Sequence, residues 1–130
     1  MIFVVDDDPS VRKALKRLLS SAGFNVEAFG SAEDVLKSSQ QPLADGFVID
    51  VRMPGMSGLE LQRRLLAAGS RVPVIFITAH EDVEARTAAM EAGAAAFLQK
   101  PFDDRTLLEA VETGLKRKAP EPQDVDDMRQ

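Results

Sequence analysis

The sequence predicts an α/β fold: a doubly wound, five-stranded parallel sheet flanked by five helices. Short segments with strand-like apolarity alternate five times with longer segments of helical periodicity. Strands that alternate with helices in this way pair in parallel, because each helix crosses a face of the sheet to reach the next strand. The chain has 130 residues, enough for one domain with a full core.

The first half of the chain contains two expected strands and two expected helices. Residues 2–5 form an all-apolar run, whereas residues 24–28 alternate and predict an edge strand. Ser31 is expected to cap a short helix that Gln41–Pro42 ends. The helix between the two strands opens at Pro9–Ser10 and closes at Gly23. Its apolar stripe is expected to comprise Val11, Ala14, Leu15, Leu18, Leu19 and Ala22.

The second half repeats the alternation three times. Buried strands are expected at residues 47–49 and 73–77, a fifth strand is expected at 95–99, and Asp103 should cap the last helix. A Leu-rich helix starts at Ser57 or Gly58 and closes near Gly69. The helix at residues 82–92 differs, because its inward candidates are only Val83, Thr87 and Met90 and the rest is mostly Ala. It should bury little apolar area and be free to shift.

The composition excludes several classes of function. There is no Cys and a single His, which excludes disulfides, thiolate chemistry and multi-histidine metal sites. The net charge of −5 argues against direct nucleic-acid binding by this segment. No signal peptide or membrane span is expected at the start of the chain, so a cytoplasmic location is expected. Residues 119–130 are polar, contain Pro and Asp, and are expected to form a linker after a domain of residues 1–118.

Reactive side chains follow four of the five expected strands. Asp6 and Asp7 follow the first, Asp50 the third, Thr78 the fourth and Lys100 the fifth. The carboxyl ends of parallel strands share one edge of the sheet, so these side chains should converge. Taken singly, each could be a turn residue or a surface group. Together, three carboxylates require a hard cation such as Mg²⁺, and an Asp can serve as a nucleophile that forms an acyl phosphate.

The chain resembles the receiver domains of two-component response regulators over about residues 2 to 117. The resemblance is carried by VVDDD at 4–8, DVRMPGMSG at 50–58, ITA at 77–79 and AGAAAFLQKPF at 92–102. It implies the CheY-like, flavodoxin-like strand order 2-1-3-4-5. Motifs of competing classes are absent: there is no GxxxxGK[ST], and Arg52 stands where a haloacid-dehalogenase phosphatase needs a second Asp.

The resemblance also implies the site residues and their roles. Asp50 would be phosphorylated by a sensor histidine kinase, so the chain would be a phosphoacceptor rather than an enzyme acting on other molecules. Thr78 and Lys100 would contact the phosphoryl group, Phe97 would be the aromatic switch, and the Lys100–Pro101 peptide would be cis. Mg²⁺, or alternatively Mn²⁺, would be held by Asp7, Asp50 and the backbone carbonyl of Arg52, with Asp6 acting largely through water.

Two positions that vary within the family, Arg52 and His80, should overhang the phosphoryl site and tune the lifetime of the acyl phosphate. Before phosphorylation, the side chain of Arg52 could pair with the acidic cluster and partly take the place of the metal. Replacing it is therefore expected to change Mg²⁺ affinity and lifetime while the fold stays intact.

Two outputs remain open from the sequence. The segments DVRMPGMSGLEL and FLQKPF are similar to those of FixJ/NarL-type transcriptional regulators. DNA would then be bound only through an effector domain beyond residue 130. The alternative is a stand-alone receiver that acts as a phosphorylation-dependent protein adaptor. In either case, receivers of this kind often form homodimers through the face made by the 82–92 helix, the fifth strand and the last helix. No membrane partner is expected.

Overall fold

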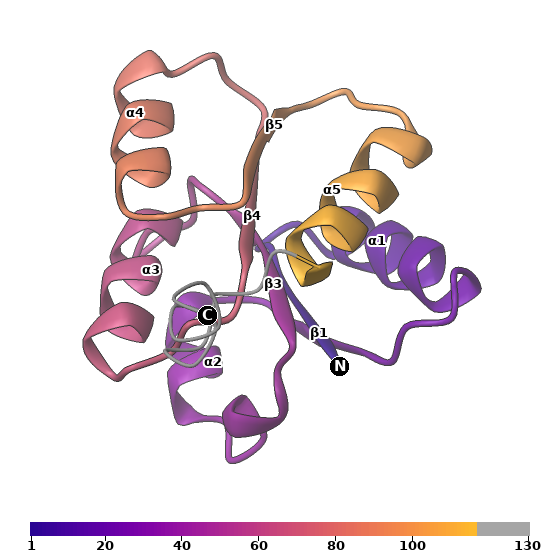
Figure 1. Cartoon of the computed structure of the whole chain (residues 1–130), viewed down its shortest axis with the longest axis horizontal. Helices are drawn as coiled ribbons and strands as arrows, with labels where there is room; N and C mark the ends of the chain where they lie inside the picture. The colour runs from indigo at the N-terminus through magenta and orange to yellow at the C-terminus, as the bar shows by residue number, and fades with distance from the viewer. Residues whose placement is uncertain (117–130) are drawn as a thin grey trace, which may run out of the picture.

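The computed structural model describes residues 1–116 as a five-stranded parallel sheet in the order β2-β1-β3-β4-β5 (Figure 1). This order and the edge position of β2 confirm the predicted fold class. The tail at 119–130 lies outside the described residues, so its assignment as a linker stays a prediction. The elements are β1 (Ile2–Val5), α1 (Pro9–Ser21), β2 (Val26–Phe29), α2 (Ala32–Lys37), the 3-10 helix η1 (Gln41–Leu43), β3 (Gly46–Asp50), α3 (Gly58–Ala67), β4 (Val74–Thr78), α4 (Val83–Glu91), β5 (Ala96–Gln99) and α5 (Asp104–Lys116).

Helices cover both faces of the sheet, and each face has its own apolar core. Helices α2, α3 and α4 pack over one face, and α1 and α5 pack over the other (Figure 1). Successive strand residues point to opposite faces, so Phe3 and Val5 enter the first core while Ile2 and Val4 enter the second. Burial on both faces explains why the central strands β1, β3 and β4 are apolar up to their carboxyl ends, where Asp50 closes β3 and Thr78 closes β4.

The helix boundaries follow the capping signals in the sequence. The hydroxyls of Ser31 and Ser57 accept the backbone N–H groups of the third residues that follow them, and Asp103 does the same at α5. The predicted stripe of α1 was too wide. Leu15 and Leu19 are buried, but Ala14 and Ala22 are exposed, because the helix touches the sheet along a narrower band.

The prediction of which residues of α4 face inward was wrong. Ala85 and Ala89 are its buried residues, whereas Val83 is 68% exposed and Met90 is 42% exposed. Thr87 is exposed as well. The helix is therefore rotated so that its smallest side chains meet the sheet. The inference that α4 is lightly anchored holds for a stronger reason, since two methyl groups bury less apolar area than Val and Met would.

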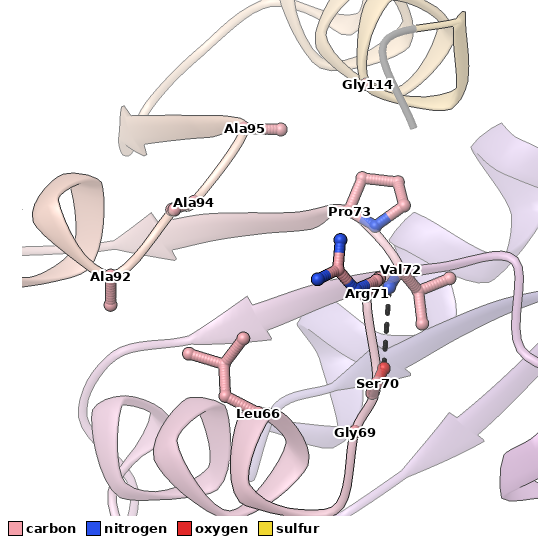
Figure 2. A pocket seen from close by; sticks show the side chains of 11 residues that line it. Leu66, Gly69, Ser70, Arg71, Val72, Pro73, Ala92, Ala94, Ala95 and Gly114 are labelled. Atoms are coloured by element: carbon pink, nitrogen blue, oxygen red, sulfur yellow. Dashed lines mark hydrogen bonds between the residues drawn. The ribbon is translucent and has the colours of Figure 1, made fainter. Parts of the chain in front are cut away.

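The amino and carboxyl ends of the strands carry different features. At the amino end, a cavity of about 440 Å³ opens between the loops that precede β4 and β5. Figure 2 shows Leu66, Arg71 and Pro73 around it, together with Gly114 of α5. None of the predicted site residues lines this cavity; they lie at the opposite, carboxyl ends of the strands. Among the described helices, none is both long and apolar enough to cross a bilayer.

Candidate functional site

Three carboxylates meet at the carboxyl edge of the sheet. One oxygen from each of Asp6, Asp7 and Asp50 lies within 4.8 Å of the others. The sheet explains this convergence, because β1 and β3 are neighbours with Val5 opposite Ile49, and Asp6 and Asp50 come next on each strand. Asp6 and Asp50 are buried, whereas Asp7 is exposed. The cluster therefore has two fixed, desolvated members and one that faces solvent.

Asp6 is held by contacts from three directions. Its Oδ2 accepts from Lys100 Nζ at 3.2 Å, and its Oδ1 accepts from the backbone N–H of Asp8 at 2.9 Å. Its backbone carbonyl accepts from Arg12 Nη1 at 2.7 Å. Lys100 thus reaches the acidic cluster as predicted, and in this state its ion pair is with Asp6.

Asp50 is in an environment that disfavours its charge. Burial raises the pKa of its carboxyl to about 6, and the negative charge of Asp6 adds to the effect, while Lys100 opposes it. Three ionised carboxylates and one ammonium leave two negative charges at the site. One divalent cation would neutralise them, and carboxylate oxygens are the ligands that hard cations prefer. The donor set therefore fits Mg²⁺.

The loop after Asp50 is closed at its base. The backbone N–H of Gly58 donates to Val51 O at 2.9 Å, and the N–H of Arg52 donates to Asp50 Oδ1 at 3.3 Å. A Cβ at Gly58 would lie 2.3 Å from Asp50 O, so a larger residue at 58 would displace the end of β3. Gly55 has a φ of 76°, which favours glycine in the turn.

Thr78 and Lys100 lie at adjacent strand ends. Thr78 is buried, and its Oγ1 accepts the backbone N–H of His80 at 3.2 Å. The N–H of Lys100 donates to Thr78 O at 2.7 Å, and the Lys100–Pro101 peptide is cis, as expected. Phe97 is buried beside Phe76 with the Arg86 guanidinium 5.8 Å from its ring centre. The side chain of His80 is exposed and lines a cavity of about 80 Å³ that includes Phe97.

The expectation that Arg52 pairs with the acidic cluster was wrong. Its Nη2 donates to Asp82 Oδ2 at 2.8 Å, and the side chain is 58% exposed. Asp82 precedes α4 and has a partly exposed carboxylate, whereas the cluster already has Lys100 as its cation. The arginine therefore lies against α4, where it takes part in the rim of a groove between the loop and that helix.

Four residues at or near the site were not identified from the sequence. Arg12 binds the Asp6 carbonyl, Glu33 accepts the backbone N–H of Met56, and Asp82 pairs with Arg52. Gln62 is buried and donates to Ala89 O of α4 at 3.2 Å. Local sequence spacing does not reveal these contacts, because the partners of Glu33 and Asp82 lie 23 and 30 residues away in the chain.

Comparison with known proteins gives one consistent answer. The family model for the response regulator receiver domain matches residues 2–112. Nodulation protein W of Bradyrhizobium diazoefficiens is 44% identical over 117 residues, which are 90% of this chain and 52% of that protein. The transcriptional regulatory protein FixJ of Azorhizobium caulinodans is 46% identical over 119 residues, covering 91% of this chain and 56% of FixJ. The chain thus spans about half the length of these relatives.

Solved structures agree with the sequence relatives. The response regulator StyR superposes with a TM-score of 0.84 at 48% identity, covering 99% of this chain and 65% of StyR. The crystal structure of FixJ-N gives a TM-score of 0.82 at 39% identity, covering 92% of this chain and 96% of FixJ-N. The fold, the edge that carries the carboxylates and the sequence relatives all agree, and the chain belongs to the response regulator receiver domain family.

Proposed function

We propose that this receiver is a signalling switch that accepts a phosphoryl group on Asp50 from a sensor histidine kinase in a Mg²⁺-dependent reaction. The observation that carries the proposal is the convergence of the Asp6, Asp7 and Asp50 carboxylates, with Lys100 paired to Asp6. The chain is a phosphoacceptor that promotes only its own phosphorylation and dephosphorylation. Like other response regulators, it would act in the cytoplasm.

The metal would be held by the carboxylates of Asp7 and Asp50 and by the backbone carbonyl of Arg52, with Asp6 acting largely through water; Mn²⁺ would suit the same donors. When bound, the metal supplies positive charge that offsets the excess of carboxylates and lets an anionic phosphate donor approach. Support for this assignment comes from the two uncompensated negative charges of the cluster and from the exposure of Asp7.

In the transfer step, one carboxylate oxygen of Asp50 attacks phosphorus and forms an acyl phosphate, while the bond from phosphorus to the donor breaks. The donor leaves with the bonding electron pair. Lys100 would then exchange its contact with Asp6 for a phosphoryl oxygen. Thr78 is suited to donate, because its Oγ1 already accepts from the His80 N–H and its own proton remains available.

The signal would pass to the α4-β5-α5 face. Thr78 drawn toward the phosphoryl group, Phe97 as the aromatic switch and a lightly anchored α4 form the proposed route. The exposed Val83 and Met90 of α4 support a homodimer formed on phosphorylation through this face. A transcriptional output, with DNA bound by an effector domain outside this segment, is favoured over a stand-alone adaptor because FixJ relatives are named transcriptional regulatory proteins.

Incubation with acetyl phosphate and Mg²⁺, followed by intact-mass measurement, tests the proposal. Wild type should gain one phosphoryl group and Asp50→Asn none, and EDTA should abolish the adduct. Asp34→Asn is a matched control, because it removes an exposed carboxylate from α2 and should leave phosphorylation unchanged. An adduct on Asp50→Asn, or none on wild type, would overturn the assignment.

A further inference from the structure

The loop that carries the Arg52 carbonyl is held at its far end by Glu33 of helix α2. Glu33 Oε2, in the first turn of α2, accepts the backbone N–H of Met56 at 3.0 Å. The same carboxylate packs on Gly55, where an added Cβ would lie 2.7 Å from Oε2. Glu33 therefore contacts two consecutive residues of the turn that follows Pro54.

The other end of this loop is fixed by the sheet. Gly58 N donates to Val51 O, and Gly58 packs directly on Asp50 O. The segment from Arg52 to Met56 is therefore held between a closed base and the Glu33 carboxylate. Within it, the peptide after Arg52 supplies the carbonyl assigned to the metal.

Glu33 is itself well placed to act as a rigid attachment. Ser31 caps α2, and Ala32 and Val35 bury that helix in the core. The backbone N–H of Glu33 and that of Met56 hold the pKa of the Glu33 carboxyl below its usual value, so it is ionised at neutral pH.

We propose that Glu33 is a positioning residue for the metal site. By holding the Met56 N–H it orients the Arg52 carbonyl and so raises the affinity for Mg²⁺, without touching the metal. This role rests on the proposed Mg²⁺-dependent function. Partners that orient metal ligands from one shell further out commonly change metal affinity by about 10-fold or more when they are removed.

Two substitutions separate the hydrogen bond from the charge. Glu33→Asp keeps the charge but shortens the side chain by one methylene, so its carboxylate falls short of Met56. Glu33→Gln loses the charge but keeps an oxygen that can accept the same N–H. Calorimetric titration with Mg²⁺ alone should show about 10-fold weaker binding for Glu33→Asp and little change for Glu33→Gln. Asp34→Ala, which removes the neighbouring exposed charge, should bind as wild type does.

A second readout works without metal. Amide hydrogen exchange at Met56 in EDTA should be faster in Glu33→Asp than in Glu33→Gln or wild type, and circular dichroism melting should confirm that all variants fold. Weaker Mg²⁺ binding in Glu33→Gln alone would mean that the charge matters and would overturn the positioning role. Unchanged binding in Glu33→Asp would overturn it as well. If wild type binds no Mg²⁺ and Asp50 is not phosphorylated, the proposed function fails as well. If phosphorylation is normal but Mg²⁺ affinity is the same in wild type and all Glu33 variants, only the positioning role fails.

Discussion

Arg52 and Asp82 join the loop that follows Asp50 to the start of α4. Arg52 Nη2 donates to Asp82 Oδ2 at 2.8 Å, while Asp82 Oδ1 accepts the N–H of Ala85 and caps α4. These contacts hold the pKa of the Asp82 carboxyl below its usual value, the largest contribution coming from the Ala85 N–H. One carboxylate thus connects the residue two positions after Asp50 with the first turn of α4.

We expect Arg52→Ala to loosen the start of α4 while the fold stays intact. The arginine is largely exposed, and an exposed ion pair contributes little to global stability, so the melting temperature should hardly change. Hydrogen exchange in the first turn of α4 should accelerate several-fold, because the cap loses the partner that holds it to the loop. The acyl-phosphate lifetime should change as well, since Arg52 borders Asp50.

Arg64→Ala is a suitable control for that experiment. Arg64 also forms an exposed ion pair, with Glu60 of α3, and is 55% exposed. Its removal should leave exchange in α4 and the lifetime unchanged. Equal exchange rates in α4 for wild type and Arg52→Ala would show that the ion pair does not restrain the helix.

The sequence was sufficient for the fold and for the convergence at the carboxyl edge. Alternating strands and helices determine which end of every strand meets the others, so strand order and direction alone bring Asp6, Asp50 and Lys100 together. The face of α4 that packs against the sheet could not be predicted in this way. Its period allowed Val83 and Met90 to face inward, and the choice of Ala85 and Ala89 depends on the close approach of the helix to β5 and α3.

The partners of long side chains could not be predicted from the sequence either. Arg52 was expected to pair with the acidic cluster, but its side chain pairs with Asp82, and Lys100 pairs with Asp6 of the cluster. Gln62 is a polar residue of α3, yet it is buried, and its side-chain amide donates to Ala89 O of α4. Such choices depend on which groups are already paired, and that pairing is settled by the packing of the whole domain.

The raised pKa of Asp50 makes stability depend on pH in the metal-free protein. The folded-state pKa is about 6 against an ordinary value of 3.8, so ionisation costs more in the folded state than in the unfolded chain. The unfolding free energy should therefore fall as pH rises from about 4 to 6, with the full cost present above pH 6. That shift corresponds to about 2 to 3 kcal/mol.

Urea unfolding in EDTA of wild type and Asp50→Asn measures this cost. Below pH 4 the two should be nearly equal, because the wild-type carboxyl is protonated. Above pH 6 the Asn variant should be more stable by about 2 kcal/mol, since it has no charge to bury. A difference in unfolding free energy that stays constant across pH 4 to 8 would show that the folded protein does not raise the pKa of the Asp50 carboxyl.

Lys100 is expected to stabilise the metal-free site through Asp6. Asp6 is buried, and removing its cationic partner leaves a carboxylate without compensating charge. We expect Lys100→Met to lower the unfolding free energy in EDTA by about 2 kcal/mol, less than for a fully buried pair because the lysine is partly exposed. Lys13→Met, at an exposed position of α1, is the control. A loss equal to that of the control would mean that the pair contributes nothing.

Substitution of an exposed apolar side chain on α4 tests the proposed homodimer. Met90 is 42% exposed on a helix whose buried residues are alanines, so it is available to a partner without any rearrangement of the core. Burial of such a side chain in an interface is favourable, whereas burial of an unpaired carboxylate is costly. We expect phosphorylated wild type to dimerise in Mg²⁺, as measured by analytical ultracentrifugation, and Met90→Glu to remain monomeric with normal phosphorylation of Asp50.

Leu43→Glu provides the matched control, because Leu43 is also apolar and 60% exposed but lies on η1, on another part of the surface. This variant should dimerise as wild type does. Loss of dimer in both variants would indicate a general effect of added charge. Loss in Leu43→Glu alone would place the interface at η1 and exclude the α4 face, since both variants replace an exposed apolar side chain with Glu but on different parts of the surface.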